Sequence, residues 1–288
     1  MSAPTALVRA ARPHQWTKNV LVLAPLLPAG QLLSWSAVAG AGIAFVSFCF
    51  AASGIYLLND VLDVEADRAH PVKRRRPIAS GELSPRAAWI VAALFLVGAL
   101  VVALAARPEL IVVIAVYELI QIAYCFGIKH EPVLELASVA SGFLLRALAG
   151  GVAAGIPLSQ WFLMTAAFGS LFMAAGKRYA ESRLGEREGV SVRRVVERYT
   201  PTYLRFVWTL SGTAVVVTYS LWAFEVGESS ASVWPVVSTI PFVLAILRFA
   251  VDVDAGAAEA PDQIVVHDRA LLALGTIWIA TLAAAVYT

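Results

Sequence analysis

Residues 37–58 read AVAGAGIAFVSFCFAASGIYLL, and the acid-rich sequence NDVLDVEAD follows directly at 59–67. The first stretch contains no charged side chain, and a helix that spans a bilayer needs about 20 mostly apolar residues. The sequence therefore predicts a transmembrane helix that ends in a cluster of carboxylates. Both the fold class and the place of the chemistry depend on this junction.

The rest of the chain has the same apolar character. Hydrophobic residues make up 59% of its 288 positions, and the mean hydropathy is +0.75, which excludes an ordinary soluble domain. We predict a single all-α domain over residues 1–288 with nine transmembrane helices and no nucleic-acid partner. Besides 37–58, the predicted spans are 20–36, kinked at Pro25 and Pro28, and 86–106, 109–128, 132–155, 160–180, 203–225, 232–251 and 269–287.

Basic residues alternate between the two sides of these spans. Lys and Arg gather before the first span, in 68–86 and in 177–198, whereas Arg107 is the one basic residue on the other side. Because Lys and Arg near helix ends favour the cytoplasm, we expect a multi-pass protein of the plasma membrane with a cytoplasmic N-terminus. The acid-rich junction then faces the cytoplasm.

The polar side chains at that junction have a helical spacing. If the helix continues, Asn59, Asp60, Asp63 and Asp67 share one face, and their carboxylates repel one another unless a cation lies between them. An oxygen-only ligand set suits a hard ion, and positions left open for phosphate oxygens suit Mg²⁺. These four residues are therefore the predicted magnesium ligands.

A run of four cations, Lys73 to Arg76, follows this predicted metal site. Such a run alone is typical of a topology signal or of contact with anionic lipid. Beside a metal-binding face we interpret it as an anion clamp, with Lys73 and Arg76 predicted to bind phosphate.

The acidic spacing, followed by the turn Arg76-Pro77-Ile78-Ala79-Ser80-Gly81, resembles the first signature of the UbiA superfamily of membrane prenyltransferases. The resemblance implies a nine-helix bundle with cytoplasmic active-site loops. It also implies that Asn59, Asp60, Asp63 and Asp67 hold magnesium, which in turn holds the diphosphate of the donor.

The chain departs from the common family pattern at a second motif, Asp-x-x-x-Asp, where it has Gly176-Lys177-Arg178-Tyr179-Ala180-Glu181. It is similar instead to a branch that transfers 5-phosphoribose from 5-phosphoribosyl 1-diphosphate to a polyprenyl (decaprenyl) phosphate, a step that supplies arabinose for a cell-wall arabinan. The stretches that carry this likeness are 12–19, 124–130, 145–151 and 176–181.

That reaction brings several phosphates together, so we interpret the additional cations as phosphate ligands. We assign catalytic roles to Asn59, Asp60, Asp63 and Lys177. Arg146 lies in the middle of a predicted span, where a charge costs roughly 2.5–3.5 kcal/mol, and it is expected either to bind phosphate or to form an ion pair with Glu118 or Glu135. The predicted substrate-binding residues are Lys18, Tyr56, Lys73, Arg76, Tyr124, Lys129, Arg146 and Arg178.

Two other functions stay open at this point. A UbiA-type prenyltransferase would move a prenyl diphosphate onto an aromatic or porphyrin acceptor. A transporter could use the acidic face to bind divalent cations, although a path through the membrane needs polar groups at every depth. Assembly into a homo-oligomer is compatible with either.

Overall fold

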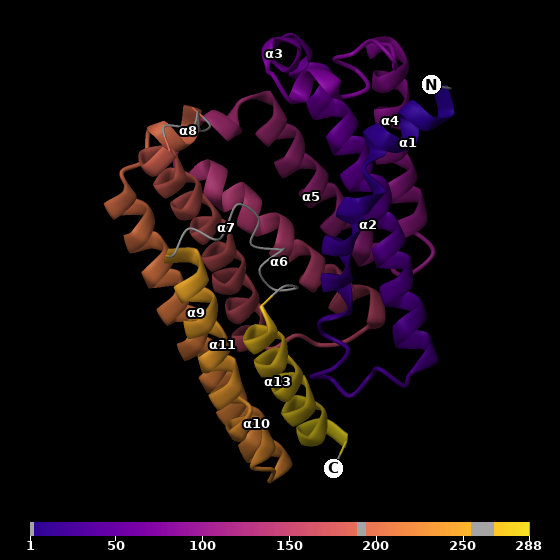
Figure 1. Cartoon of the computed structure of the whole chain (residues 1–288). Coiled ribbons are helices and arrows are strands. Elements are labelled where there is room, and N and C mark those ends of the chain that lie inside the picture. Colours follow the sequence, from indigo (N-terminus) through magenta and orange to yellow (C-terminus); the bar gives the residue numbers. More distant parts are fainter. Residues whose placement is uncertain (1–2, 189–193, 255–267, 288) are drawn as a thin grey trace. The chain divides into compact units, whose positions relative to one another are not determined.

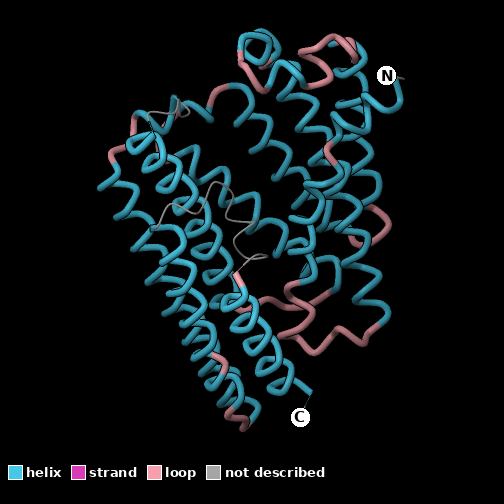
Figure 2. The backbone as a smooth tube through the Cα atoms, in the orientation of Figure 1, coloured by secondary structure: helices cyan, strands magenta, loops and turns pink. Residues whose placement is uncertain are grey.

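The computed structural model describes residues 3–188, 194–254 and 268–287, and over these residues all regular structure is helical. Figures 1 and 2 show the long helices and the short connections between them. The all-α expectation is confirmed for this part of the chain.

The chain divides into two compact units. The first falls within Met1–Leu26, Gln31–Lys129 and Leu145–Pro157, and the second within Leu27–Gly30, His130–Leu144 and Leu158–Thr288. The expectation of a single domain stays a prediction.

The first unit is built around one long helix, α2 (Trp35–Leu62), which packs against α4 (Pro85–Ala103), α5 (Pro108–Phe126) and the 3-10 helix η1 (Pro13–Leu23). Phe48, Leu57 and Ile114 are fully buried in its core. Short elements surround its polar end: α1 (Ala3–Ala11), α3 (Val64–Ala69), η2 (Lys73–Arg75) and η3 (Ile128–His130).

Helix α6 (Leu134–Ala154) gives its second half to this unit. A Cβ added at Gly150 would overlap the carbonyl oxygen of Val22, so glycine lets the backbones of η1 and α6 touch. This contact helps to hold the N-terminal segment in place.

The second unit consists mainly of long helices packed side by side. Helix α7 (Gln160–Glu188) packs along α9 (Pro201–Ser230), and α11 (Thr239–Asp254) packs along α13 (Arg269–Tyr287). Phe172 stacks on Trp208 with 5.7 Å between the ring centroids, and Phe249 packs on the same Phe172 ring. The short helices α8 (Arg194–Glu197) and α10 (Trp234–Val237) complete the described part.

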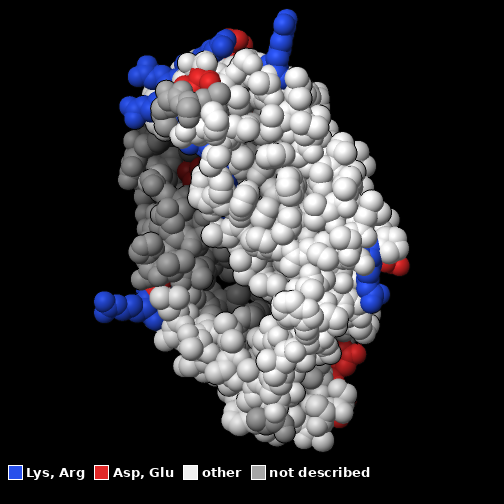
Figure 3. Space-filling model, turned by 90° about the vertical axis from the view of Figure 1, so that its right-hand side faces the viewer, with Lys and Arg blue, Asp and Glu red and all other residues white. Residues whose placement is uncertain are grey.

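Seven of the described helical segments are long and apolar enough to cross a membrane: α2, α4, α5, α6, α9, α10 with α11, and α13. On α4, the side chains of Ile90, Leu94, Val97 and Val101 are more than half exposed, which suits contact with lipid tails. Figure 3 shows a face of the molecule that is uncharged over most of its area. The protein is therefore a multi-pass integral membrane protein.

Two of the nine predicted spans differ from the prediction. Residues 160–180 do form a helix, α7, but it is not among the seven apolar segments. The predicted kinked helix at 20–36 does not form, because η1 ends at Leu23, turns continue to Gly30, and α2 begins only at Trp35. Pro25 and Pro28 lack the backbone N–H that a helix interior requires.

Candidate functional site

The site begins where α2 ends. Asp63 follows the last residue of α2 and precedes α3, with φ −93° and ψ 7°, so the unbroken helix that the sequence suggested is interrupted there. Backbone hydrogen bonds still cross the interruption. The N–H of Asp63 donates to the backbone carbonyl oxygen of Asn59 at 2.9 Å, and the N–H of Asp67 donates to that of Asp63 at 2.8 Å. The acidic residues thus stay on successive turns.

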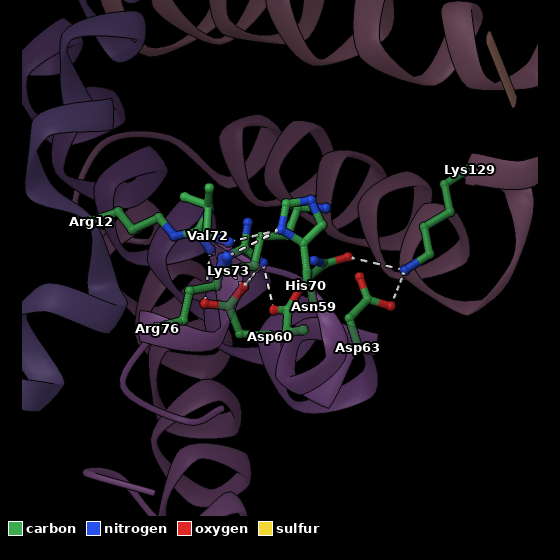
Figure 4. Close-up of polar contacts among 10 residues, drawn as sticks. Arg12, Asn59, Asp60, Asp63, His70, Val72, Lys73, Arg76 and Lys129 are labelled. Atoms are coloured by element: carbon green, nitrogen blue, oxygen red, sulfur yellow. Dashed lines mark hydrogen bonds and ion pairs between the residues drawn. The ribbon is translucent and has the colours of Figure 1, made fainter. Parts of the chain in front are cut away.

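Asp60 lies at the centre of this cluster and is only 2% exposed. Arg12 donates from one terminal nitrogen to both of its carboxylate oxygens, at 2.6 and 2.8 Å, and Arg76 donates to Oδ1 at 3.0 Å. Figure 4 shows the two guanidinium groups approaching Asp60 from different segments. Hydrogen bonds between oppositely charged groups are stronger than those between neutral groups, so the two arginines hold this buried carboxylate in place.

Arg76 also joins Asp60 to Asp67. The same nitrogen that donates to Asp60 donates to Oδ2 of Asp67 at 2.7 Å, and the Asp67 side chain is buried as well. Arg76 therefore occupies the position between two carboxylates that a metal cation could take.

Lys129 has the same relation to the other half of the motif. Its Nζ donates to Oδ1 of Asp63 at 2.6 Å and to Oδ1 of Asn59 at 3.4 Å (Figure 4). The four predicted ligands thus form two pairs. Asp60 and Asp67 accept from one nitrogen of Arg76, and Asn59 and Asp63 accept from Nζ of Lys129.

The residues present fit a hard divalent cation by their chemistry. All four donors are oxygens, as Mg²⁺ prefers, and each pair already converges on a positive charge. Among the residues that the structure describes, no three His, Cys, Asp or Glu side chains lie in a metal-binding group as they stand. Asp60 and Asp67, with Asn59 and Asp63, are the residues that would hold the ion once the basic side chains withdraw.

Arg12 is a site residue that sequence reasoning did not select. Its backbone is left-handed, with φ 52° and ψ 58°, a conformation that costs a non-glycine residue roughly 1–2 kcal/mol. The guanidinium also lies over the ring of Tyr56, 5.0 Å from the centroid. Arg12 is the first residue of the stretch 12–19, which carries part of the likeness to the phosphoribosyl-transferring branch, and this position could have identified it as a candidate.

Two contacts fix the segment that carries Arg12. The indole N–H of Trp16 donates to Oγ of Ser53 at 3.1 Å, and that hydroxyl donates to the carbonyl oxygen of Ala11 at 2.9 Å. The start of η1 is therefore tied to α2, one helical turn or more before the acidic motif.

Arg146 lies within the first unit and is 7% exposed. It donates to Oδ1 of Asn19 at 2.8 Å and to the hydroxyl of Tyr117 at 3.3 Å, and its guanidinium lies 5.0 Å from the ring centroid of Phe48. Cation–π contact and neutral acceptors thus help to compensate the buried charge. Asn19 is a second residue that sequence reasoning did not select.

Comparison with known proteins places this arrangement in a family. The model of the UbiA prenyltransferase family matches residues 20–272. The chain belongs to this family. It is therefore a membrane enzyme of the transferase class, as the motif at 59–67 predicted.

Relatives of this UbiA family member extend over nearly its whole length. It is 55% identical over 284 residues to the decaprenyl-phosphate phosphoribosyltransferase of Mycobacterium tuberculosis, with 97% of this chain and 94% of that protein covered. It is 52% identical over 287 residues to the protein of the same name from Corynebacterium glutamicum, with 98% and 86% covered.

Solved structures agree on the fold. A UbiA homolog from Archaeoglobus fulgidus, bound to GPP and Mg²⁺, has a TM-score of 0.75 at 17% identity and covers 98% of this chain and 100% of its own. A digeranylgeranylglyceryl phosphate synthase structure has a TM-score of 0.69 at 16% identity, with all of both chains covered. The predicted UbiA-like helical bundle is confirmed as a class.

The second unit of this UbiA family member holds Lys177 and Arg178 on α7. Arg178 is buried and donates from Nε to Glu135 at 2.9 Å, from a terminal nitrogen to the same Glu135 oxygen, and to Glu181 at 3.0 Å. Glu135, considered from the sequence as a partner for Arg146, is thus the partner of Arg178. Lys177 is partly buried, and the catalytic role predicted for it stays a prediction.

Other predicted substrate-binding residues are in the first unit. Lys73 is exposed on η2, whereas Lys18 on η1 and Tyr124 near the end of α5 are partly exposed. The structure brings Tyr56, Arg76 and Lys129 directly to the acidic cluster or its arginine partners. Contact of any of these side chains with substrate stays a prediction.

Proposed function

We propose that this enzyme transfers 5-phosphoribose from 5-phosphoribosyl 1-diphosphate to a polyprenyl phosphate and releases diphosphate. The full-length similarity to two decaprenyl-phosphate phosphoribosyltransferases supports decaprenyl phosphate as the acceptor class. The product is a lipid-linked phosphoribose that can serve as a precursor of cell-wall arabinan.

The observation that carries this proposal is the charge balance at the acidic cluster. Asp60, Asp63 and Asp67 are already paired with three cations, Arg12, Arg76 and Lys129. A divalent ion added to such a cluster gives it an excess of positive charge. That excess suits a donor with both a diphosphate and a further phosphate.

The same pairs suggest how the site changes as it loads. When Mg²⁺ is bound, it would neutralise charge on the departing diphosphate. Arg12, Arg76 and Lys129, no longer needed to neutralise the aspartates, then donate to phosphate oxygens. These side chains would hold the donor with its ribose C1 facing the acceptor phosphate.

In the proposed reaction, the bond between ribose C1 and the diphosphate oxygen breaks, and its electron pair leaves with the diphosphate. An oxygen of the acceptor phosphate forms the new bond to C1, which carries oxocarbenium character during the transfer. A phosphomonoester has a second pKa near 6, so it is ionised at neutral pH. No side chain is then needed to remove a proton from the acceptor.

We infer that the site faces the cytoplasm of a cell with the protein in its plasma membrane. The basic residues of η2 and its neighbours, Lys73 to Arg76, adjoin the acidic cluster, and loops rich in Lys and Arg favour the cytoplasmic side.

A prenyltransferase reaction is the second candidate, because the Archaeoglobus fulgidus homolog of the same fold binds GPP. Purified protein is therefore incubated with Mg²⁺, decaprenyl phosphate and either radiolabelled 5-phosphoribosyl 1-diphosphate or a labelled prenyl diphosphate. We expect labelled lipid only from the phosphoribosyl donor. A parallel incubation contains an aromatic acceptor, and transfer onto it from the prenyl diphosphate, with no transfer from the phosphoribosyl donor in either incubation, would replace the proposal with the second candidate.

A further inference from the structure

The first unit contains an open pocket of about 530 Å³ near η2. Its charged lining residues are all basic: Arg9 of α1, and Lys73, Arg75 and Arg76 of the η2 segment. His14 of η1 also lines it, and none of its lining residues is acidic. The volume lies within the usual range for ligand sites, about 300–1,000 Å³.

Hydrogen bonds hold the pocket wall in shape. The ring nitrogen Nδ1 of His70 accepts the backbone N–H groups of Val72 and Lys73, at 3.2 and 3.3 Å, which fixes the turn that leads into η2 (Figure 4). Arg76 is held by Asp60 and Asp67 as described above. The basic lining thus stands on a defined backbone.

Two contacts hold the side chain of Arg9, which lines the same pocket. It donates to Glu82 at 2.9 Å and to the carbonyl oxygen of Arg75 at 3.3 Å. The contact with Arg75 connects α1 with the η2 segment, 66 residues later in the chain. The pocket is therefore formed by two segments that the fold brings together.

Two valines make the pocket unusual for a site that binds only soluble anions. Val8 and Val72 line it and are 57% and 70% exposed. In a membrane protein, aliphatic side chains next to Lys and Arg suit the boundary between lipid head groups and lipid tails. A molecule with a phosphate and an attached hydrocarbon chain would satisfy both kinds of lining.

We propose that this pocket binds the phosphate head group of a lipid, with Arg9, Lys73 and Arg75 as its ligands and Val8 and Val72 beside the start of the lipid chain. The head group can come from two sources, the polyprenyl phosphate acceptor or an anionic phospholipid of the bilayer. The first source rests on the proposed function, whereas the second does not. Arg76 would connect this pocket to the acidic cluster, because it lines the one and pairs with the other.

The experiment measures lipid binding without donor or metal, so its outcome does not depend on turnover. Purified full-length protein in neutral detergent is titrated with decaprenyl phosphate, with phosphatidylglycerol or with inorganic phosphate, and bound molecules are counted by native mass spectrometry. Arg75→Gln is compared with Arg74→Gln. The two residues are adjacent, exposed and equally charged, but only Arg75 lines the pocket.

We expect Arg75→Gln to weaken binding of the lipid phosphate by about tenfold, as for the loss of one charge-assisted hydrogen bond, and Arg74→Gln to leave it within twofold. Tighter binding of decaprenyl phosphate than of phosphatidylglycerol would identify the acceptor as the occupant, and the reverse would identify a bilayer lipid. Equal weakening by both variants would overturn the proposal in favour of diffuse surface charge. Inorganic phosphate that binds as tightly as either lipid would also overturn it.

Discussion

Arg12 and Asp60 form a contact between residues 48 positions apart, in which one guanidinium nitrogen donates to both carboxylate oxygens at 2.6 and 2.8 Å. It connects the segment before η1 with the polar end of α2. The N-terminal segment is therefore part of the acidic cluster rather than a tail that precedes it.

Replacement of Arg12 should impair donor binding. Arg12→Gln removes a charge and leaves Asp60 with Arg76 alone, so we expect a 10- to 100-fold loss of kcat/KM for the phosphoribosyl donor, as for about 1.5–3 kcal/mol of charge-assisted hydrogen bonding. Arg12→Lys should recover part of the loss. Arg86→Gln, at an exposed residue near the start of α4, is the matched control and should keep normal kinetics. Equal kinetics for Arg12→Gln and this control would exclude Arg12 from the site.

Replacements of Asp60 and Asp63 should both abolish turnover but should destabilise the fold to different extents. Asp60→Asn and Asp63→Asn should each abolish measurable transfer. Asp60 is 2% exposed with two arginine partners, whereas Asp63 has a side chain 32% exposed and a lysine partner. We therefore expect metal-free Asp60→Asn to unfold at a clearly lower temperature than metal-free Asp63→Asn, because it removes the carboxylate partner of Arg12 and one of the two carboxylate partners of Arg76. The opposite order in a thermal unfolding assay would contradict the geometry.

Arg146 and Asn19 should be energetically coupled. Arg146→Met leaves the Oδ1 atom of buried Asn19 without its 2.8 Å donor, and we expect each single variant, Arg146→Met or Asn19→Leu, to lose about 2 kcal/mol of unfolding free energy. The double variant should lose less than the sum of the two. Strict additivity would show that the contact does not contribute. A raised donor KM in the folded Arg146→Met protein would support the phosphate-binding role predicted from the sequence.

Lys177 offers a test of donor specificity. Lys177→Asp restores the carboxylate that the common UbiA motif has at this position, so we expect it to lose use of the phosphoribosyl donor by 100-fold or more, through loss of one positive charge and gain of a negative one. Lys177→Arg should retain most activity. Initial rates with the labelled donor measure both variants, and unchanged rates for Lys177→Asp would remove Lys177 from the catalytic set.

Much of the fold could be predicted because its signal is local. Mostly apolar runs of about 20 residues predict spanning helices directly, and the seven apolar segments coincide with predicted spans. The prediction of a helix over residues 20–36 was wrong, because Pro25 and Pro28 prevent the helix that the hydropathy of this stretch suggests. Hydropathy reports which solvent a segment prefers and not whether its backbone can form a helix.

At the site, the residues of the acidic motif could be predicted from their spacing, but their distant partners could not. The spacing of Asn59, Asp60 and Asp63 is local, so the sequence could predict that their side chains lie in one cluster, whereas their role as metal ligands stays a prediction. Their partners Arg12 and Lys129 lie 48 and 66 positions away, so only the fold could pair them with the motif. Glu135 was a plausible partner for Arg146 by sequence, but it pairs with Arg178, because the topology and not the spacing decides which charges meet.

A titration of the metal-free protein with Mn²⁺, a spectroscopic substitute for Mg²⁺, followed by electron paramagnetic resonance, tests directly whether the acidic end of α2 binds metal. We predict that the wild-type protein binds Mn²⁺, that 5-phosphoribosyl 1-diphosphate tightens this binding, and that an Asp60→Asn/Asp63→Asn double variant loses it. If the double variant binds Mn²⁺ as tightly as the wild type, the acidic end of α2 is not the metal site.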